Sequence, residues 1–152
     1  MTTTIVKHPA DLMNMVGQTL GPSEPLTITQ SRIDQFAEAT GDHQWIHVDP
    51  ERAKDGPFGA TIAHGYLTLS LANCFLPELL SVENVSMGVN YGTEKVRFPA
   101  PVPVDSTITA RGEILSVEEN KGGFKAVIQI TITAEGADRP ACIVDTISIF
   151  YP

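Results

Sequence analysis

Hydrophobic and polar residues alternate along the second half of the chain. The alternation is strict from residue 124 to residue 134, where every second side chain is apolar. The apolar set is Phe124, Ala126, Ile128, Ile130, Ile132 and Ala134, and the set between them is Lys125, Val127, Gln129, Thr131 and Thr133. A period of two places one set on each face of an extended chain, which predicts a strand with one buried face.

The same period continues on both sides of that strand. Residues 107–119 precede it and residues 141–151 follow it, joined to it by the turn sequences NKGG and EGADRP. Short turns connect neighbouring antiparallel strands, so a three-stranded meander is predicted. Residues 85–98 predict a fourth strand, interrupted near Tyr91 and Gly92.

The first half of the chain has helical periodicity instead. Residues 30–40 place one stripe at helical spacing, made of Ile33, Phe36, Ala37 and Thr40. Thr29 or Ser31 is available as the N-cap of this helix, and Gly41 as its terminator. Pro50 and the four residues after it predict a short second helix, because proline is tolerated in a first helical turn.

A third helical segment, residues 66–80, is apolar nearly all round and follows a glycine-rich loop at residues 55–65. A helix without a polar face has to be enclosed by other structure, and the strands can supply it. The order of helix, loop, buried helix and strands predicts an α+β fold in which an antiparallel β-sheet is wrapped around a long central α-helix. The 152 residues fit a single domain, spanning residues 1–152.

The composition and net charge of the chain restrict the classes of molecule that it is expected to bind. Apolar residues make up 42 % of the chain and charged residues 18 %, which is typical of a folded protein. Eighteen acidic residues against ten basic ones give a net charge of −8, and no basic run is present that could follow a phosphate backbone. We therefore expect no nucleic-acid partner.

The chain shows no targeting or membrane signal. Its N-terminal twenty residues lack a basic region followed by an apolar core, and its longest apolar stretch is interrupted before reaching the ~20 residues that a bilayer requires. We expect no membrane association and a cytoplasmic location. Cys74 and Cys142 match no zinc or redox spacing, and both are expected to be small buried apolar residues.

Titratable chemistry is concentrated in residues 40–50, TGDHQWIHVDP. Asp42 and His47 would point about 140° apart on a continuous helix, but on a loop after Gly41 they can converge on one small molecule. A carboxylate and an imidazole together form an acid and base pair. The structural alternative remains open at this point: Asp42 caps the next turn and His47 satisfies a buried hydrogen bond.

Two other catalytic arrangements fit the cluster poorly. His43 and His47 have the i, i+4 spacing of a zinc helix, with Asp42 and Asp49 nearby, but Gln44 stands where a zinc protease has its glutamate. The pair also follows a predicted helix end, so no metal is predicted. A Ser-His-Asp hydrolase is not indicated, because the chain has no G-x-S-x-G motif.

A second informative stretch is residues 63–73, AHGYLTLSLAN. Gly65 directly precedes the predicted central helix, so its backbone N–H can bind a carbonyl oxygen that gains negative charge. The alternative is that Gly65 only lets the chain enter the helix while His64 covers its end.

Taken together, FAEATGDHQWIHVDPERA and FGATIAHGYLTLSLA resemble the MaoC-like dehydratase family, the (R)-specific enoyl-CoA hydratases. The resemblance runs from about residue 27 to the C-terminus. It implies a hot-dog fold and a homodimer with the active site at the interface. It also implies reversible hydration of trans-2-enoyl-CoA to (3R)-hydroxyacyl-CoA in fatty-acid metabolism.

The resemblance also implies roles for individual residues. Asp42 and His47 resemble the catalytic dyad, in which Asp42 takes a proton from water and His47 passes one to the α-carbon, although the sequence does not fix which does which. The Gly65 amide resembles the oxyanion donor, and Asn73 a polar residue that supports the dyad. The family usually has Asn-Pro where this chain has Gln44-Trp45, which puts the local loop shape in question.

The implied substrate is an acyl-CoA or acyl carrier protein thioester, so neither a metal nor a further cofactor is needed. Lys95 and Arg97, together with Tyr91 and Gly92 at the strand break before them, are candidates to bind the substrate or its carrier. For the two charged residues, ordinary solvated charge is the alternative. One rival function is a non-catalytic acyl-thioester-binding module or dehydratase subunit. Another is a thioesterase, which would need a carboxylate such as Glu78 at the central helix.

Overall fold

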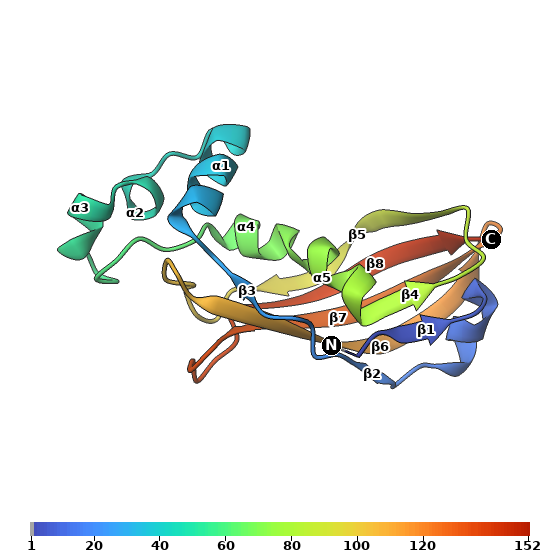
Figure 1. Ribbon diagram of the computed structural model, residues 1–152. Helices are drawn as coiled ribbons and strands as arrows, with labels where there is room; N and C mark the ends of the chain where they lie inside the picture. Colours follow the sequence, from blue (N-terminus) through green and yellow to red (C-terminus); the bar gives the residue numbers. More distant parts are fainter. Residues whose placement is uncertain (1) are drawn as a thin grey trace.

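The computed structural model describes residues 2–152. Its helices are α1 (Gln30–Thr40), α2 (Trp45–Val48), α3 (Pro50–Lys54), α4 (Gly65–Ser70) and α5 (Ala72–Leu79), with a 3-10 helix η1 at Pro9–Asn14. Its strands are β1 (Thr4–Val6), β2 (Thr19–Leu20), β3 (Leu26–Thr27), β4 (Leu80–Val82), β5 (Met87–Arg97), β6 (Thr107–Asn120), β7 (Gly123–Ala134) and β8 (Cys142–Tyr151). Figure 1 shows α4 and α5 lying across one face of a single large sheet.

The predicted meander is confirmed. The main sheet has the order β2-β6-β7-β8-β5, with β6, β7 and β8 antiparallel neighbours and β3 also paired with β6. Along β7 the predicted alternation sets the burial, since Ile128, Ile130 and Ile132 are fully buried against the helices. A separate parallel pair joins β1 to β4.

The fourth predicted strand, β5, is the edge of the main sheet. It pairs with β8 on one side, and the pairing register shifts between Asn90 and Gly92, at the predicted interruption. A residue left out of the pairing makes a β-bulge, which bends the strand. A second shift lies between Thr93 and Val96.

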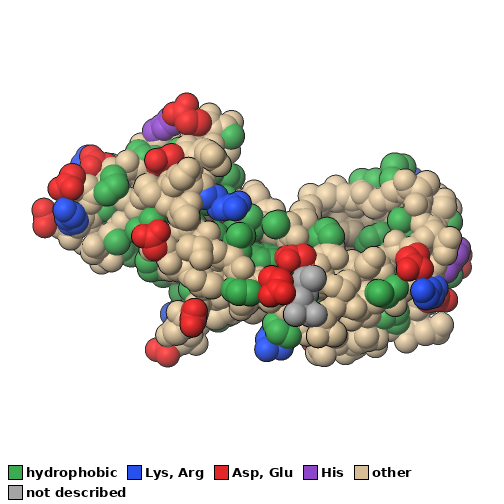
Figure 2. Space-filling view, in the orientation of Figure 1, with side chains coloured by type: hydrophobic (Ala, Val, Ile, Leu, Met, Phe, Trp, Pro, Cys, Tyr) green, Lys and Arg blue, Asp and Glu red, His purple; other side chains and the backbone are tan. Residues whose placement is uncertain are grey.

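The predicted central helix is present, although the sheet does not enclose it on every side within this chain. It is divided into α4 and α5 at Leu71, and the sheet covers only one side of it. The uncovered side carries an exposed stripe at helical spacing: Tyr66, Ser70, Asn73, Cys74 and Pro77. Figure 2 shows the surface hollowed over this part of the molecule.

The first predicted helix is confirmed as α1, capped by the Thr29 hydroxyl and ended by Gly41 in the left-handed region at φ 85°. Thr40, predicted on its apolar stripe, is exposed instead and donates its hydroxyl to the Phe36 carbonyl. The short second helix is confirmed as α3. Between them lies α2, a single turn that periodicity could not predict because it is too short to repeat. We call α1, α2 and α3 the helical lobe, which projects beyond one end of the sheet in Figure 1.

The two cysteines differ from each other. Cys142 is fully buried, as predicted, and burial raises the pKa of its thiol to about 11. Cys74 was expected to be buried but is exposed, because it lies on the uncovered side of α5. Within residues 2–152, no helix has both the length and the apolar character needed to cross a membrane.

Candidate active site

His47 is a buried imidazole with one nitrogen already in use. It lies on α2, is 6 % exposed, and its Nδ1 is 2.8 Å from the backbone oxygen of Ile62. A carbonyl oxygen only accepts hydrogen bonds, so Nδ1 carries the proton. In the neutral ring Nε2 therefore has a free lone pair, which makes it a base.

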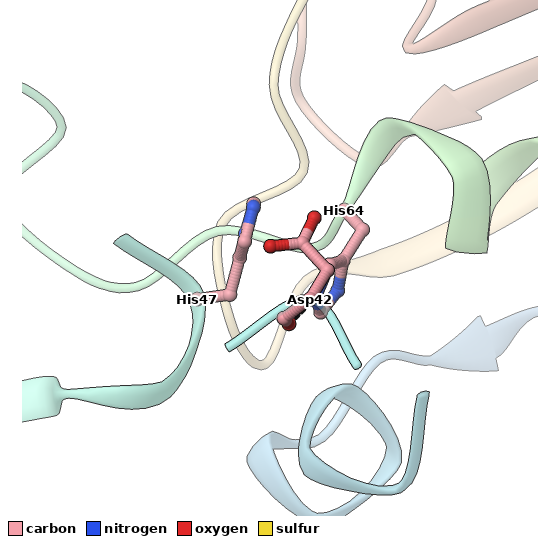
Figure 3. Close-up of side chains that lie close together, drawn as sticks. All are labelled: Asp42, His47 and His64. Carbon is pink, nitrogen blue, oxygen red and sulfur yellow. Dashed lines mark hydrogen bonds between the residues drawn. The ribbon is translucent and has the colours of Figure 1, made fainter. Parts of the chain in front are cut away.

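Asp42 lies beside His47 on the segment between α1 and α2 (Figure 3). Its Oδ1 accepts a hydrogen bond from the Gln44 amide at 3.3 Å, which is the capping contact of the structural alternative. Both contacts of that alternative are thus present. They occupy one carboxylate oxygen and one imidazole nitrogen, and they leave Asp42 Oδ2 and His47 Nε2 free for chemistry.

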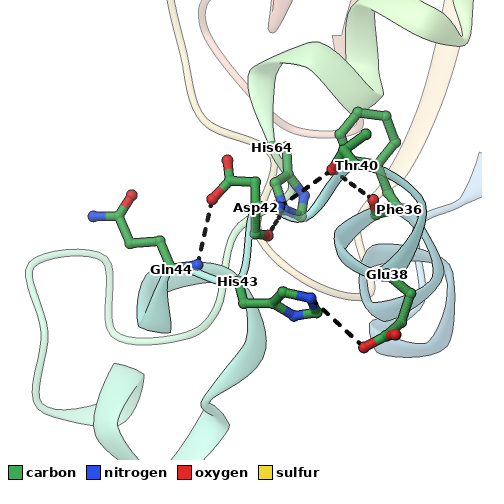
Figure 4. Close-up of polar contacts among 7 residues, drawn as sticks. All are labelled: Phe36, Glu38, Thr40, Asp42, His43, Gln44 and His64. Atoms are coloured by element: carbon green, nitrogen blue, oxygen red, sulfur yellow. Dashed lines mark hydrogen bonds and ion pairs between the residues drawn. The ribbon is translucent and has the colours of Figure 1, made fainter.

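His64 completes the cluster. It is 2 % exposed, its ring stacks on that of His47 with centroids 3.9 Å apart, and its Nε2 lies 3.0 Å from the Asp42 backbone oxygen (Figure 4). By the same argument Nε2 is the donor. His64 Nδ1 is then a buried acceptor, and in the described part of the chain it has no hydrogen-bond partner. Leaving such a group unpaired costs about 1–3 kcal/mol, so a hydrogen-bond donor at this atom would be stabilising.

Asp42, His47 and His64 each offer one possible ligand atom, and these atoms lie within 4.8 Å of one another. The two imidazole rings are nearly parallel, at 22°. Their lone pairs lie in the ring planes, so they do not converge on one point as the ligands of a tetrahedral metal do. The arrangement suits a hydrogen-bonded water better than an ion. His43, considered above as a ligand, points away to Glu38 at 3.6 Å.

Burial lowers the pKa of His47 below its ordinary value of 6.5. The neighbouring His64 acts in the same direction, whereas the hydrogen bond with Ile62 and the Asp42 charge oppose it. The net effect keeps the ring neutral near neutral pH. A neutral ring is the form that can accept a proton from water.

The side chain of Gln30, at the start of α1, forms hydrogen bonds to the segments that carry the cluster. Its amide nitrogen donates to the His47 backbone oxygen at 2.8 Å and to Asp34 at 2.9 Å, and its amide oxygen accepts from the Thr61 hydroxyl at 2.5 Å. One side chain thus joins α1, α2 and the segment before α4.

Gly65 follows His64 at the start of α4. The first amides bonded within this helix are those of Leu67 and Thr68, both to the His64 oxygen, so the Gly65 amide has no acceptor within the helix. A cavity of about 360 Å³ opens at Gly65, walled by apolar side chains that include Phe58, Ile62 and Phe98. A side chain on Gly65 would approach the Phe98 ring to 3.2 Å, so glycine keeps this cavity open.

The other predicted site residues lie elsewhere. Asn73 is on the exposed side of α5, roughly 12 Å along the helix from Gly65 by helical rise, and contacts a different cavity. Lys95 and Arg97 are exposed on β5, three residues and one residue before Phe98 respectively. Gly92 lines a cavity against the uncovered side of α4 and α5.

Tyr91 points away from the helices. It is 64 % exposed, and the Lys125 ammonium lies 5.8 Å from its ring. Lys125 alternates with the core residues of β7, so it lies on the outer face of the sheet. The structure therefore brings Asp42 and His47 together with His64, and Gly65 directly follows His64 in the chain. The predicted residues outside this group are Asn73, Tyr91, Gly92, Lys95 and Arg97.

The departure at Gln44-Trp45 affects the helical lobe more than the dyad. The Trp45 ring packs on the backbone at Gly56, and the Arg52 guanidinium lies 4.3 Å from its centroid. Trp45 therefore joins α2 to α3 and the turn after it. The loop shape that was in question is set by this packing.

His64 and Gln30 were not predicted as site residues. His64 was interpreted as a helix end cover, although its place directly before Gly65 was a usable signal. Gln30 gave none, because a glutamine in the first turn of an amphipathic helix is ordinary, and its three partners come from separate segments.

Comparison with known proteins is consistent with this geometry. A family model described as "MaoC like domain" matches residues 11–136. The 3-hydroxyacyl-thioester dehydratase Z of Mycobacterium tuberculosis is 48 % identical over 139 residues, covering 91 % of this chain and 92 % of the relative. The crystal structure of the (R)-hydratase from A. caviae, described as involved in PHA biosynthesis, aligns with a TM-score of 0.71 at 25 % identity, covering 90 % of this chain and 96 % of that one.

Proteins of this fold also occur in complexes of two different chains. One is the HadBC (3R)-hydroxyacyl-ACP dehydratase complex of Mycobacterium tuberculosis, with a TM-score of 0.71 at 18 % identity, covering 90 % of this chain and 96 % of that one. At that identity the likeness concerns the fold alone. The hot-dog fold expected from the sequence is confirmed by these neighbours.

Proposed function

The chain belongs to the family of MaoC-like domains, and we propose that it is a hydro-lyase that adds water reversibly to a trans-2-enoyl thioester, giving a (3R)-hydroxyacyl thioester. The observation that carries the proposal is the free Nε2 of buried His47 beside the Asp42 carboxylate. His64, which belongs to the same cluster, directly precedes Gly65, whose amide has no acceptor within α4.

In the proposed reaction Asp42 and His47 hold one water molecule. His47 Nε2 takes a proton from it, because a neutral ring with its proton on Nδ1 has to accept a proton before it can give one. The water oxygen bonds to C3, and the π electrons move through C2 to the thioester oxygen. The imidazolium then returns the proton to C2, so the dyad ends as it began.

The two other groups stabilise charge. Asp42 lies beside the imidazolium while it exists, and the Gly65 amide donates to the thioester oxygen while it is negative. This assignment gives the proton to His47 where the sequence favoured Asp42. The thioester itself acidifies C2, so the proposal needs neither a metal nor a further cofactor.

The apolar cavity at Gly65 suits the uncharged part of the substrate, since such pockets combine apolar walls with a few polar groups. Coenzyme A or an acyl carrier protein would carry the acyl chain. Arg97 directly precedes Phe98, which lines this cavity, so Arg97 and Lys95 are the proposed contacts of the anionic carrier. A role in fatty-acid metabolism and a cytoplasmic location belong to the same proposal.

A homodimer is the proposed assembly. β5 is an eleven-residue edge strand with exposed side chains that include Met87, and such edges are usually paired or protected. The uncovered stripe of α4 and α5 is exposed beside it. Light scattering on the purified chain should give twice the 16.4 kDa of one protomer. A mass of one protomer, with a dimer formed only when a different chain is added, would replace the proposed homodimer by a complex of two different chains.

The activity test uses crotonyl-CoA, followed by loss of enoyl absorbance, with chiral analysis of the product. Asp42→Asn and His47→Gln should each lower kcat by about 100-fold or more while remaining folded, because each removes a proton-transfer or charge-stabilising group. Release of free thiol would indicate the thioesterase instead. Silence of the wild type on short and long enoyl chains would favour the binding module.

A further inference from the structure

We infer that His64 is a positioning residue that aligns the two halves of the active site, the dyad on one side and the Gly65 amide on the other. The inference rests on the proposed function, because that reaction needs both halves to meet one enoyl thioester. Asp42 and His47 come from the segment after α1, whereas Gly65 comes from the start of α4. Something has to fix the distance between these segments.

His64 links the two segments directly. Its Nε2–H donates to the Asp42 backbone oxygen at 3.0 Å. Its own backbone oxygen accepts from Leu67 at 3.0 Å and from Thr68 at 3.2 Å, which starts α4. The residue that holds the Asp42 backbone is therefore the one whose peptide bond carries the Gly65 amide.

The His64 ring contacts two other rings. His47 stacks on one side, with centroids 3.9 Å apart, and the Phe36 ring of α1 lies 4.8 Å away at 55°. At 2 % exposure the His64 ring cannot turn without displacing one of these neighbours. Its orientation therefore also restricts that of the His47 ring stacked on it (Figure 3).

The unpaired Nδ1 separates this residue from a simple packing histidine. Most buried polar side-chain atoms have a hydrogen-bond partner, and among residues 2–152 this nitrogen is the buried side-chain polar atom left without one. With Nε2 as donor, Nδ1 accepts. A water molecule is the donor that the proposed reaction itself brings to this cluster.

The test separates the hydrogen bond from the stacking. In His64→Gln the amide nitrogen stands the same number of bonds from Cα as Nε2, so the variant can still donate to Asp42. His64→Phe keeps the ring and loses the donor, and His64→Ala loses both. We expect His64→Gln to retain kcat within about tenfold, and His64→Phe and His64→Ala to lose about 100-fold with little change in KM, because small misalignments act on the chemical step.

A second measurement, by NMR, does not depend on enzymatic turnover. Imidazole ¹⁵N shifts of His47 should show the single Nδ1–H form in the wild type and in His64→Phe, where a ring still holds His47 against the Ile62 oxygen. In His64→Ala the stacking is lost, the His47 ring can leave that oxygen, and a mixture of forms is expected. A kcat unchanged in all three variants, or lowered equally in His64→Gln and His64→Phe, would overturn the inference. A fall in melting temperature with kcat per folded molecule unchanged would also overturn it, by making His64 merely structural.

Failure of the proposed function can be distinguished from failure of the inference about His64. A wild type that hydrates no enoyl thioester removes the proposed reaction. The shifts of His47 still report whether His64 holds the cluster, and a single tautomer in His64→Ala would then reject the alignment independently.

Discussion

The main sheet and the helical lobe are held together in different ways. In the sheet, β6, β7 and β8 pair over their whole length and bury a continuous apolar face against α4 and α5. In the lobe, α1 is anchored to the same core through Ile33 and Phe36, whereas the segments that carry the dyad are held by individual polar contacts, chiefly those of Gln30 and His64.

This difference assigns stability and chemistry to different parts of the chain. Burial of apolar area is roughly additive and insensitive to small displacements, so it suits a scaffold. A hydrogen bond is sensitive to distance and angle, so a few of them can fix the orientation of catalytic groups. Substitutions in the sheet core should therefore act on unfolding, and substitutions at the polar contacts should act mainly on turnover.

The largest effect on unfolding is expected for Phe75→Ala. Phe75 is 1 % exposed on the covered side of α5, and removing a buried aromatic ring leaves a cavity that costs about 3–5 kcal/mol. Urea unfolding measures this loss, while kcat of the molecules that remain folded should change little. Leu115→Ala, at a position 36 % exposed, is the matched control and should cost far less.

Gln30 variants test the opposite case. Gln30→Ala removes the contacts to His47 and Thr61 together and should cost about 1–3 kcal/mol of stability and about tenfold in kcat. Gln30→Glu can still accept from Thr61 but cannot donate to the His47 backbone, so it should lose activity with less loss of stability. Full activity in both variants would show that the lobe holds the dyad without this side chain.

The dependence on pH sharpens the comparison further. The unfolded chain protonates His47 near its ordinary pKa of 6.5, whereas the folded chain does so at lower pH. Between these two values the unfolded state binds more protons, so stability falls as the pH falls below 6.5 and is unaffected above it. The acid limb of kcat/KM should likewise lie below 6.5, since the proposed base has to be neutral.

Urea midpoints measured from about pH 8 to about pH 5 test this, with His47→Gln as the control. The control removes the titrating group and should show a smaller fall in the midpoint. Equal falls in the wild type and in His47→Gln would assign the acid sensitivity to other groups.

The predictability of the two regions follows the same division. The strands could be predicted because a period of two repeats over ten or more residues, as in β7, and α1 because its stripe has a cap and a terminating glycine. The split at Leu71 and the uncovered stripe of α5 could not, because hydropathy does not record whether a second chain or solvent covers a face. Cys74 was misplaced for the same reason.

At the site, Asp42, His47 and Gly65 could be predicted because two motifs place them in order along the chain. Gln30 could not, and His64 was indicated only by its place directly before Gly65, since their roles depend on partners 17 and 22 residues away that no local pattern specifies. The tautomer of His47 belongs with these, because the oxygen that sets it is the backbone of Ile62. Sequence patterns therefore predicted the catalytic groups but not the long-range contacts that hold them in place.

Arg52→Met should have the smallest effect, and it tests whether every contact of the lobe matters for turnover. The Arg52 guanidinium lies 4.3 Å from the centre of the Trp45 ring and is exposed, so removing its charge should cost about 0.5–1 kcal/mol. The methionine chain can still cover the indole, and Trp45 keeps its packing on Gly56. Because Arg52 touches neither Gln30 nor His64, kcat on crotonyl-CoA should be unchanged while the urea midpoint falls slightly. A loss of kcat comparable to that of Gln30→Ala would mean that the lobe transmits displacements of α3 to the dyad, and that its contacts act as a unit.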